Sequence, residues 1–234
     1  MGTRHLVCIY HQGRFVVAQY GQFNGFPEIN GLKVLRFITN PDKIRKFRLD
    51  LPHIVVLSET GTPGLSPDFQ KALTYSPTSP KEYHDIFNHP ASFGNYASTE
   101  ILSYIAEADA QHPVQICRWL SFANADMCEW VYVIDLDAEV FEVYSPPHDK
   151  VIKPKGQGTL WKYLPKGKDS VDLMAKFALS DLPAEEKFLN ACYAGSDRSM
   201  GPGDSKLGEM QIGLDLVEQC AASGKGPKVV LGGQ

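Results

Sequence analysis

The sequence has little of what marks secreted, membrane-spanning or metal-binding proteins. Its 234 residues include five cysteines, an odd number at no metal-like spacing, which is typical of reduced thiols rather than of a disulfide framework or a zinc cluster. No apolar run approaches the length of a transmembrane helix, and the first residues lack the apolar core of a signal peptide. We therefore expect a cytoplasmic protein that has no membrane anchor, no metal and no cofactor.

Excess positive charge and the common catalytic motifs are lacking as well. Lys+Arg 23 stand against Asp+Glu 27, a net charge of −4, whereas a general nucleic-acid-binding protein presents a basic surface. A local basic patch is compatible with this balance. The chain contains no G-x-S-x-G, Walker A, H-E-x-x-H or paired C-x-x-C motif, so the usual signatures of serine hydrolases, phosphate-binding loops and zinc enzymes are missing.

What is present indicates one α+β domain over residues 1–234. The hydrophobic share of 43% is enough for a substantial core. Residues 6–10 and 14–20 are rich in β-branched and aromatic side chains on either side of a Gly-containing turn, which predicts a β-hairpin. Further strand-like runs with short connections predict an antiparallel meander: 114–122, 129–136 and 139–144. Because hairpin and meander are too apolar to stand alone, we expect one mainly antiparallel sheet packed by helices.

Helices and loops are indicated by period and composition. Helical spacing or composition predicts helices near residues 31–38, 101–108, 183–193 and 206–222. Asn95 or Ser98 precedes the second of these and is positioned to cap it. Residues 59–95 are rich in Pro, Ser, Thr and Gly, which predicts a loop-rich insertion. Residues 224–234 are expected to be mobile or to add an edge strand.

The segment at residues 19–27 is the first candidate binding site. It places amide and phenol groups beside glycines, which let the backbone approach a ligand closely. The alternative is a structural loop, because turns favour Gly, Asn and Pro for conformational reasons. Arg4 and His5 precede the first strand and could reach this loop, where an Arg suits a carboxylate or phosphate or else forms a surface ion pair. The candidate substrate-binding residues are Arg4, Gln19, Gln22 and Asn24.

A second candidate site surrounds Glu129. Strand alternation places Glu129 on the same face as Val131 and Val133. A carboxylate there lies either at the wet end of the strand or in the core with a partner such as Arg4, and a buried one has a raised pKa and suits a base or a counter-charge to a cationic substrate. Cys128 is expected to be a buried thiol rather than a nucleophile. The candidate catalytic residues are Tyr20, Glu129 and Tyr132.

One stretch concentrates basic side chains, with Asp42 as its only acid. It is a candidate contact for the phosphates of a nucleic acid, and the alternative is an ordinary solvated helix face. The candidate nucleic-acid-binding residues are Lys33, Arg36, Lys43, Arg45, Lys46 and Arg48.

Three segments carry a resemblance to known proteins. Residues 1–6 (MGTRHL), 17–27 (VAQYGQFNGFP) and 128–137 (CEWVYVIDLD) resemble an uncharacterised fungal family that has bacterial and phage look-alikes. These matches cover well under half of the chain. The chain also resembles the fungal arginine-containing cyclodipeptide synthases, small enzymes that join two aminoacyl groups taken from charged tRNAs, although no catalytic motif matches residue by residue. This resemblance implies an acyl-transfer enzyme that uses aminoacyl donors, with charged tRNA and an amino-acid-type small molecule as partners.

Two rival functions stay open. N-terminal-nucleophile hydrolases, which cleave amides, also start with a strand and a hairpin, but their first residue is the nucleophile, and exposure of Thr3 would require loss of both Met1 and Gly2. The other rival is a non-enzymatic module that binds a small ligand or a protein through the same loop. The working hypothesis is an aminoacyl-tRNA-dependent cyclodipeptide synthase.

Overall fold

The computed structural model describes residues 3–58, 98–124, 126–146, 158–163 and 171–194. The chain divides into two units, Met1–Ser196 and Asp197–Gln234, and every described residue lies in the first. The insertion predicted at 59–95, the helix predicted at 206–222 and the tail predicted at 224–234 lie outside the described residues. The single domain expected for the whole chain stays a prediction.

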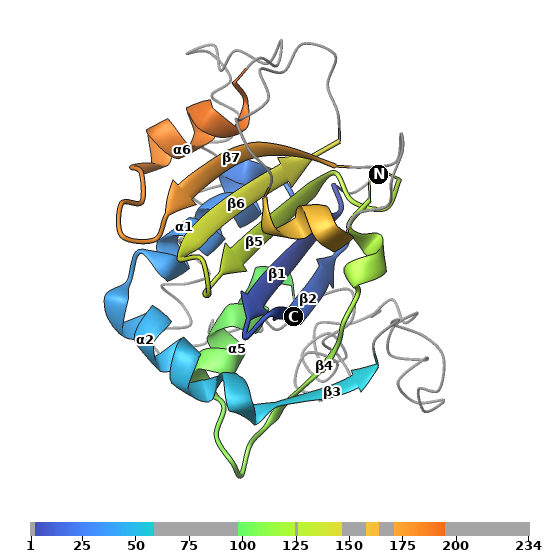
Figure 1. Ribbon diagram of the computed structural model, residues 1–234, viewed down its shortest axis with the longest axis vertical. Helices are drawn as coiled ribbons and strands as arrows, with labels where there is room; N and C mark the ends of the chain where they lie inside the picture. The colour runs from blue at the N-terminus through green and yellow to red at the C-terminus, as the bar shows by residue number, and fades with distance from the viewer. Residues whose placement is uncertain (1–2, 59–97, 125, 147–157, 164–170, 195–234) are drawn as a thin grey trace, which may run out of the picture. The chain divides into compact units, whose positions relative to one another are not determined.

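A five-stranded sheet forms the centre of the first unit, in the order β2-β1-β5-β6-β7 (Figure 1). Its strands are β1 (His5–His11), β2 (Arg14–Gly21), β5 (Trp130–Asp135), β6 (Val140–Ser145) and β7 (Asp172–Ala178). Neighbouring strands pair antiparallel except β1 and β5, which are parallel. The predicted α+β class, with a mainly antiparallel sheet that contains the N-terminal hairpin, is confirmed.

The central position of β1 and β5 follows from their composition. Both strands are apolar on both faces, as strands covered on two sides must be. Val7 and Tyr132 belong to the core on one face of the sheet, whereas Leu6 and Val131 belong to the core on the other. The hairpin therefore shares its sheet with the strand predicted at 129–136.

The turn of the hairpin has the backbone that its sequence favours. Gln12 and Gly13 both have positive φ, 51° and 77°, as in the two-residue turns whose twist matches that of the strands. The carboxylate of Asp137 accepts hydrogen bonds from both backbone amides, at 2.9 and 2.8 Å. These bonds, led by the one from Gly13, lower the pKa of Asp137. The turn is thus fixed from the neighbouring β5–β6 connection.

The predicted three-stranded meander is wrong in its first member, whereas its second and third members, β5 and β6, pair antiparallel as predicted. β4 (Val114–Cys117) pairs parallel with β3 (Ile54–Ser58) in a separate two-stranded sheet. The strand beside β6 is β7, which the sequence did not indicate. Pairing partners are set by contacts far apart in the chain, so strand-like runs with short connections do not identify them. β4 ends beside the hairpin instead, where Trp119 donates a backbone hydrogen bond to Ala18, at 2.8 Å.

Four α-helices pack on one face of the sheet, with their apolar side chains in a single core. They are α1 (Leu32–Ile38), α2 (Pro41–Asp50), α5 (Ile101–Glu107) and α6 (Glu185–Cys192), and the short helices are η1 (Pro27–Gly31), η2 (Leu51–His53), η4 (Ser98–Glu100), η5 (Leu120–Phe122) and η6 (Thr159–Tyr163). Side chains from η5 and η6 cover the other face. The helices predicted near 31–38, 101–108 and 183–193 are confirmed. No helix among the described residues is long and apolar enough to cross a membrane.

Candidate functional site

A buried histidine lies where the hairpin meets the loop that follows it. His5 begins β1 and is 0% exposed. Gly21 and Gly25 pack directly against its side chain, and the hydroxyl of Tyr132 donates to the Gly25 carbonyl at 2.7 Å. These contacts close the loop over the imidazole and hold the ring in one position.

The hydroxyl of Ser98 is the polar neighbour of this histidine. Ser98 Oγ lies 2.8 Å from His5 Nε2, although the two residues are 93 positions apart. The role predicted for Ser98 was wrong: the residue before α5 is Glu100, and no side chain caps the helix. Ser98 has a φ of 46°, a left-handed backbone that costs a non-glycine residue free energy and often marks a functional site. This backbone aims the half-buried hydroxyl at His5.

Asn30 supports the serine from the other side. Its amide nitrogen donates to the carbonyls of Asn24, at 2.6 Å, and Phe23, at 3.3 Å. This fixes the orientation of the amide. The amide oxygen accepts hydrogen bonds from the hydroxyls of Thr99, at 2.9 Å, and Ser98, at 3.2 Å. Asn30 thus ties the loop after the hairpin to the start of the α5 region.

His5 is neutral in this site. Burial and, less strongly, the positive charge of Lys33 lower its pKa to about 3, and the backbone of Thr3 opposes the fall. Nδ1 has no hydrogen-bond partner among the described residues, so the direction of the contact between Nε2 and Ser98 Oγ depends on the tautomer of the ring. In the tautomer with the proton on Nδ1, the lone pair of Nε2 accepts the single Ser98 hydroxyl proton when that proton turns away from Asn30 Oδ1, its other acceptor at 3.2 Å. A serine that donates to a neutral imidazole is the arrangement of a nucleophile and its base.

The predicted catalytic tyrosines lie on opposite faces of the sheet. By strand register Tyr20 shares a face with Leu6, whereas Tyr132 shares the face of Val7 and Gln19. Tyr20 donates to Gln22 Oε1 at 2.6 Å. Burial raises the pKa of Tyr20 to about 12 and also raises the pKa of Tyr132. Both phenols are therefore neutral donors near pH 7, and Tyr132 is the one bonded to Gly25, which packs against His5.

The buried alternative for Glu129 is wrong. Its side chain is 38% exposed and lies 3.7 Å from Arg4, the partner that was expected. This pair lies just before β5, on the Tyr20 face, as both charges act on the pKa of Tyr20. Cys128 is buried as predicted, and burial raises its pKa to about 12, which leaves an inert thiol.

The remaining predicted substrate residues are also divided. Gln19 is fully buried and donates to the Tyr20 carbonyl at 3.0 Å. Asn24 is exposed, has a φ of 57°, and contributes its backbone carbonyl to the Asn30 bond. The predicted catalytic and substrate-binding residues are therefore divided between the two faces of the sheet and one exposed loop. The polar cluster of His5, Ser98 and Asn30 lies on the face that carries His5.

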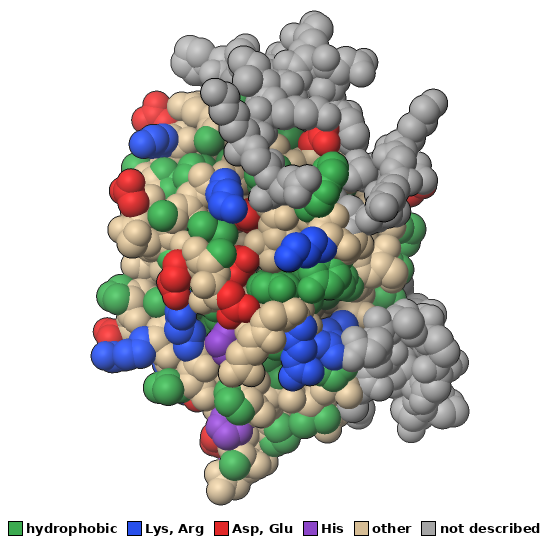
Figure 2. Space-filling view, in the orientation of Figure 1, with side chains coloured by type: hydrophobic (Ala, Val, Ile, Leu, Met, Phe, Trp, Pro, Cys, Tyr) green, Lys and Arg blue, Asp and Glu red, His purple; other side chains and the backbone are tan. Residues whose placement is uncertain are grey.

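The basic stretch is largely paired with carboxylates. Its ion pairs are Lys33 with Glu100, Arg36 with Glu185, Arg45 with Asp42, Lys46 with Asp50 and Arg48 with Glu139. Lys43 forms no ion pair within the described part of the chain. On the face shown in Figure 2, basic and acidic side chains of the described residues are interspersed. These pairs are what an ordinary solvated helix face would show.

Comparison with known proteins adds no assignment. No protein-family model, curated protein or solved structure matches this chain. Within the described residues no group of three or more His, Cys, Asp or Glu side chains is placed to hold a metal ion. The candidate site therefore depends on the His5–Ser98–Asn30 cluster. From the sequence, His5 was predicted only to lie near the loop, and Ser98 only to cap a helix. No pattern in a short window of sequence indicates that the two residues meet.

Proposed function

We propose that this protein is an acyl-transfer enzyme in which Ser98 is the nucleophile and His5 its general base. The contact of 2.8 Å between Ser98 Oγ and the neutral His5 Nε2 carries the proposal. Ser98 Oγ attacks the acyl carbon of the donor, its proton passes to Nε2, and the leaving group departs with the electrons of the cleaved bond. An amine or water then attacks the acyl-serine ester and releases Ser98.

The low pKa of His5 determines which donors suit this pair. Each unit by which a pKa falls makes protonation harder by about 1.4 kcal/mol, and here the imidazolium would form in a buried site near Lys33. The pair is therefore a weak base. Esters and thioesters suit it better than amides, because their leaving groups are far better anions than the amine of an amide. The amide-hydrolase alternative is correspondingly less favoured.

An aminoacyl ester belongs to this donor class. A charged tRNA is one kind of aminoacyl ester, and it is the donor that the resemblance to cyclodipeptide synthases implies. The carboxylates paired with the basic stretch reduce the charge that a tRNA would meet. A small aminoacyl ester or thioester would need no basic surface and would use the same serine.

A fluorophosphonate reagent tests the nucleophile directly, since it phosphonylates activated serines and releases fluoride. We expect one adduct, mapped by peptide mass spectrometry to Ser98, and none in Ser98→Ala. Ser180, exposed just after β7, supplies the control, because Ser180→Ala should label like the wild type. A folded wild-type protein that gives no adduct at Ser98 would overturn the proposal.

The donor is tested by the mass of the acyl-enzyme after incubation with an alanine thioester or with alanyl-tRNA. Acylation of Ser98 by the thioester supports the general proposal. Acylation by the charged tRNA but not by the thioester supports charged tRNA as the donor. Acylation by the thioester but not by the charged tRNA overturns the proposal that tRNA is the donor. No acyl adduct from either donor, in protein that labels with the fluorophosphonate, overturns acyl transfer from aminoacyl donors.

A further inference from the structure

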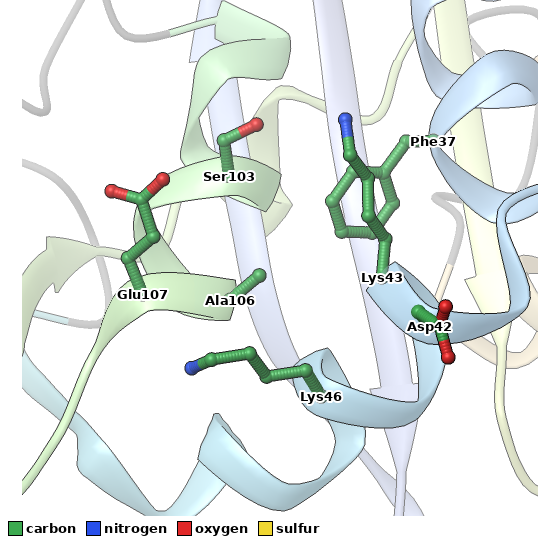
Figure 3. Close-up of a pocket in the computed structure, with 7 residues that line it drawn as sticks. All are labelled: Phe37, Asp42, Lys43, Lys46, Ser103, Ala106 and Glu107. Carbon is green, nitrogen blue, oxygen red and sulfur yellow. The ribbon is translucent and has the colours of Figure 1, made fainter.

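A pocket of about 290 Å³ lies where α2 faces α1 and α5, on the helical side of the fold (Figure 3). Its lining residues are Phe37, Asp42, Lys43, Lys46, Ser103, Ala106 and Glu107. Phe37 and Ala106 are buried and form its apolar base. Charged side chains of both signs surround that base. The volume is at the small end for ligand pockets, about 300–1,000 Å³, which limits any occupant to a small molecule.

Two of the four charges at this pocket are neutralised within the protein. Asp42 accepts from Arg45 at 2.7 Å, and Lys46 donates to Asp50 at 2.6 Å. Because each already has a partner of opposite charge, neither needs one from a ligand.

The other two charges lie on facing helices and are exposed to solvent. Lys43 is on α2 and Glu107 is on α5, and neither forms an ion pair with any described residue. In the view of Figure 3, Lys43 and Phe37 are drawn on one side of the pocket and Glu107, on α5, on the other. One positive and one negative group thus flank a single apolar base.

We infer that this pocket binds a small zwitterion with an apolar body, that is, an α-amino acid such as phenylalanine or leucine. The ligand carboxylate contacts Lys43, its ammonium group contacts Glu107, and its side chain lies on Phe37 and Ala106. The Ser103 hydroxyl, also at the pocket, offers a further hydrogen bond. A ligand with only one charge would leave one of the two protein charges without a partner, so the pocket favours a ligand that carries both.

Titration followed by amide NMR tests this site with L-phenylalanine as the probe. We expect saturable shifts at Ser103, Ala106 and Glu107. Two analogues each lack one charge: 3-phenylpropanoate has no ammonium group, and phenethylamine has no carboxylate. Each should bind about fivefold more weakly, the effect of one partly exposed ion pair. Equal affinities for the three compounds, or no saturable shift with phenylalanine, would overturn the inference.

Charge exchange gives a second, independent test. Lys43→Glu and Glu107→Lys should each weaken binding of phenylalanine by at least about fivefold. The double variant should recover most of the affinity, because a zwitterion can bind in the reverse direction. Lys187→Gln, at an exposed position on α6, is the matched control and should leave binding unchanged. A double variant as weak as the singles would contradict the assignment.

Discussion

Gly21 is in van der Waals contact with the imidazole of His5 across the end of the hairpin. A Cβ atom built on Gly21 would lie 2.2 Å from Cε1 and 2.5 Å from Nε2. Nε2 is the atom that faces the Ser98 hydroxyl. The absence of a side chain at Gly21 therefore determines where the proposed base sits, and this makes Gly21 a positioning residue.

Gly21→Ala should displace the imidazole and separate it from Ser98. We expect overpacking to lower the free energy of unfolding by about 1–3 kcal/mol, and fluorophosphonate labelling of Ser98 to slow by on the order of 100-fold, as expected for a general base moved out of reach. Gly13→Ala is the control. Gly13 has a φ of 77° and nothing within 4 Å of an added Cβ, so this change strains the same hairpin by about 1–2 kcal/mol without touching His5. Wild-type labelling in folded Gly21→Ala would contradict the role of Gly21.

The parts of the fold that could be predicted are those with local signals. The turn at Gln12 and Gly13 and the helical period of Ile101, Leu102 and Ile105 are visible in short windows of sequence, and the structure contains both. β7 was missed because its buried residues, Met174 and Ala175, are consecutive, so they show no alternation. The partner of β4 could not be predicted, because a parallel pair joins segments far apart in the chain.

The candidate site depends on a contact between distant residues. His5 and Ser98 meet where β1 pairs with β2 and where Asn30 links the loop after β2 to the start of the α5 region. A serine before a helix is typical of a cap, so local reasoning assigned Ser98 to that role. For Glu129, strand alternation predicted the correct face of the sheet. The buried alternative was wrong because the residue lies before β5 begins and reaches solvent.

Glu129→Gln should have little effect. Because the carboxylate is 38% exposed and lies 3.7 Å from Arg4, its loss should change the free energy of unfolding by less than about 1 kcal/mol. Acylation of Ser98 should stay near the wild-type rate, since the Arg4 pair lies on the other face of the sheet. Chemical denaturation and labelling kinetics check both expectations, with Arg4→Gln as the reciprocal variant. A loss of about 100-fold or more with the fold intact would return Glu129 to the catalytic candidates.

Asn30→Ala should disrupt the cluster while leaving both proposed reacting groups in place. The change removes partners from two hydroxyls and two carbonyls, and unsatisfied buried polar groups cost about 1–3 kcal/mol each before water reaches them. We expect a loss of about 2–4 kcal/mol in the free energy of unfolding and slower labelling of Ser98. Thr99→Val removes one of these bonds and should cost about 1 kcal/mol. Equal stabilities for the two variants would show that Asn30 does not organise the cluster.

The pKa of His5 predicts how stability depends on pH. In the unfolded chain this histidine binds a proton below about pH 6.5, whereas in the folded protein its pKa is about 3. Between these values the unfolded state holds more protons, so the free energy of unfolding falls as pH falls, by up to about 1.4 kcal/mol per pH unit from this residue. The contribution is complete above pH 6.5 and is lost progressively as pH falls toward 3.

His5→Gln measures this contribution, because glutamine keeps a polar group near Ser98 but does not titrate. Urea denaturation of both proteins from pH 7 to pH 4.5 should show the wild type losing about 2–3 kcal/mol more than the variant over this range. His112→Gln, at an exposed histidine paired with Asp109, should follow the wild type. Labelling of Ser98 in wild-type protein should show no titration step near pH 6.5, since His5 is neutral on both sides of it. Parallel stability curves for wild type and His5→Gln, or a labelling step centred near pH 6.5, would mean that His5 is ordinarily solvated and would remove the physical basis for a weak base that selects activated donors.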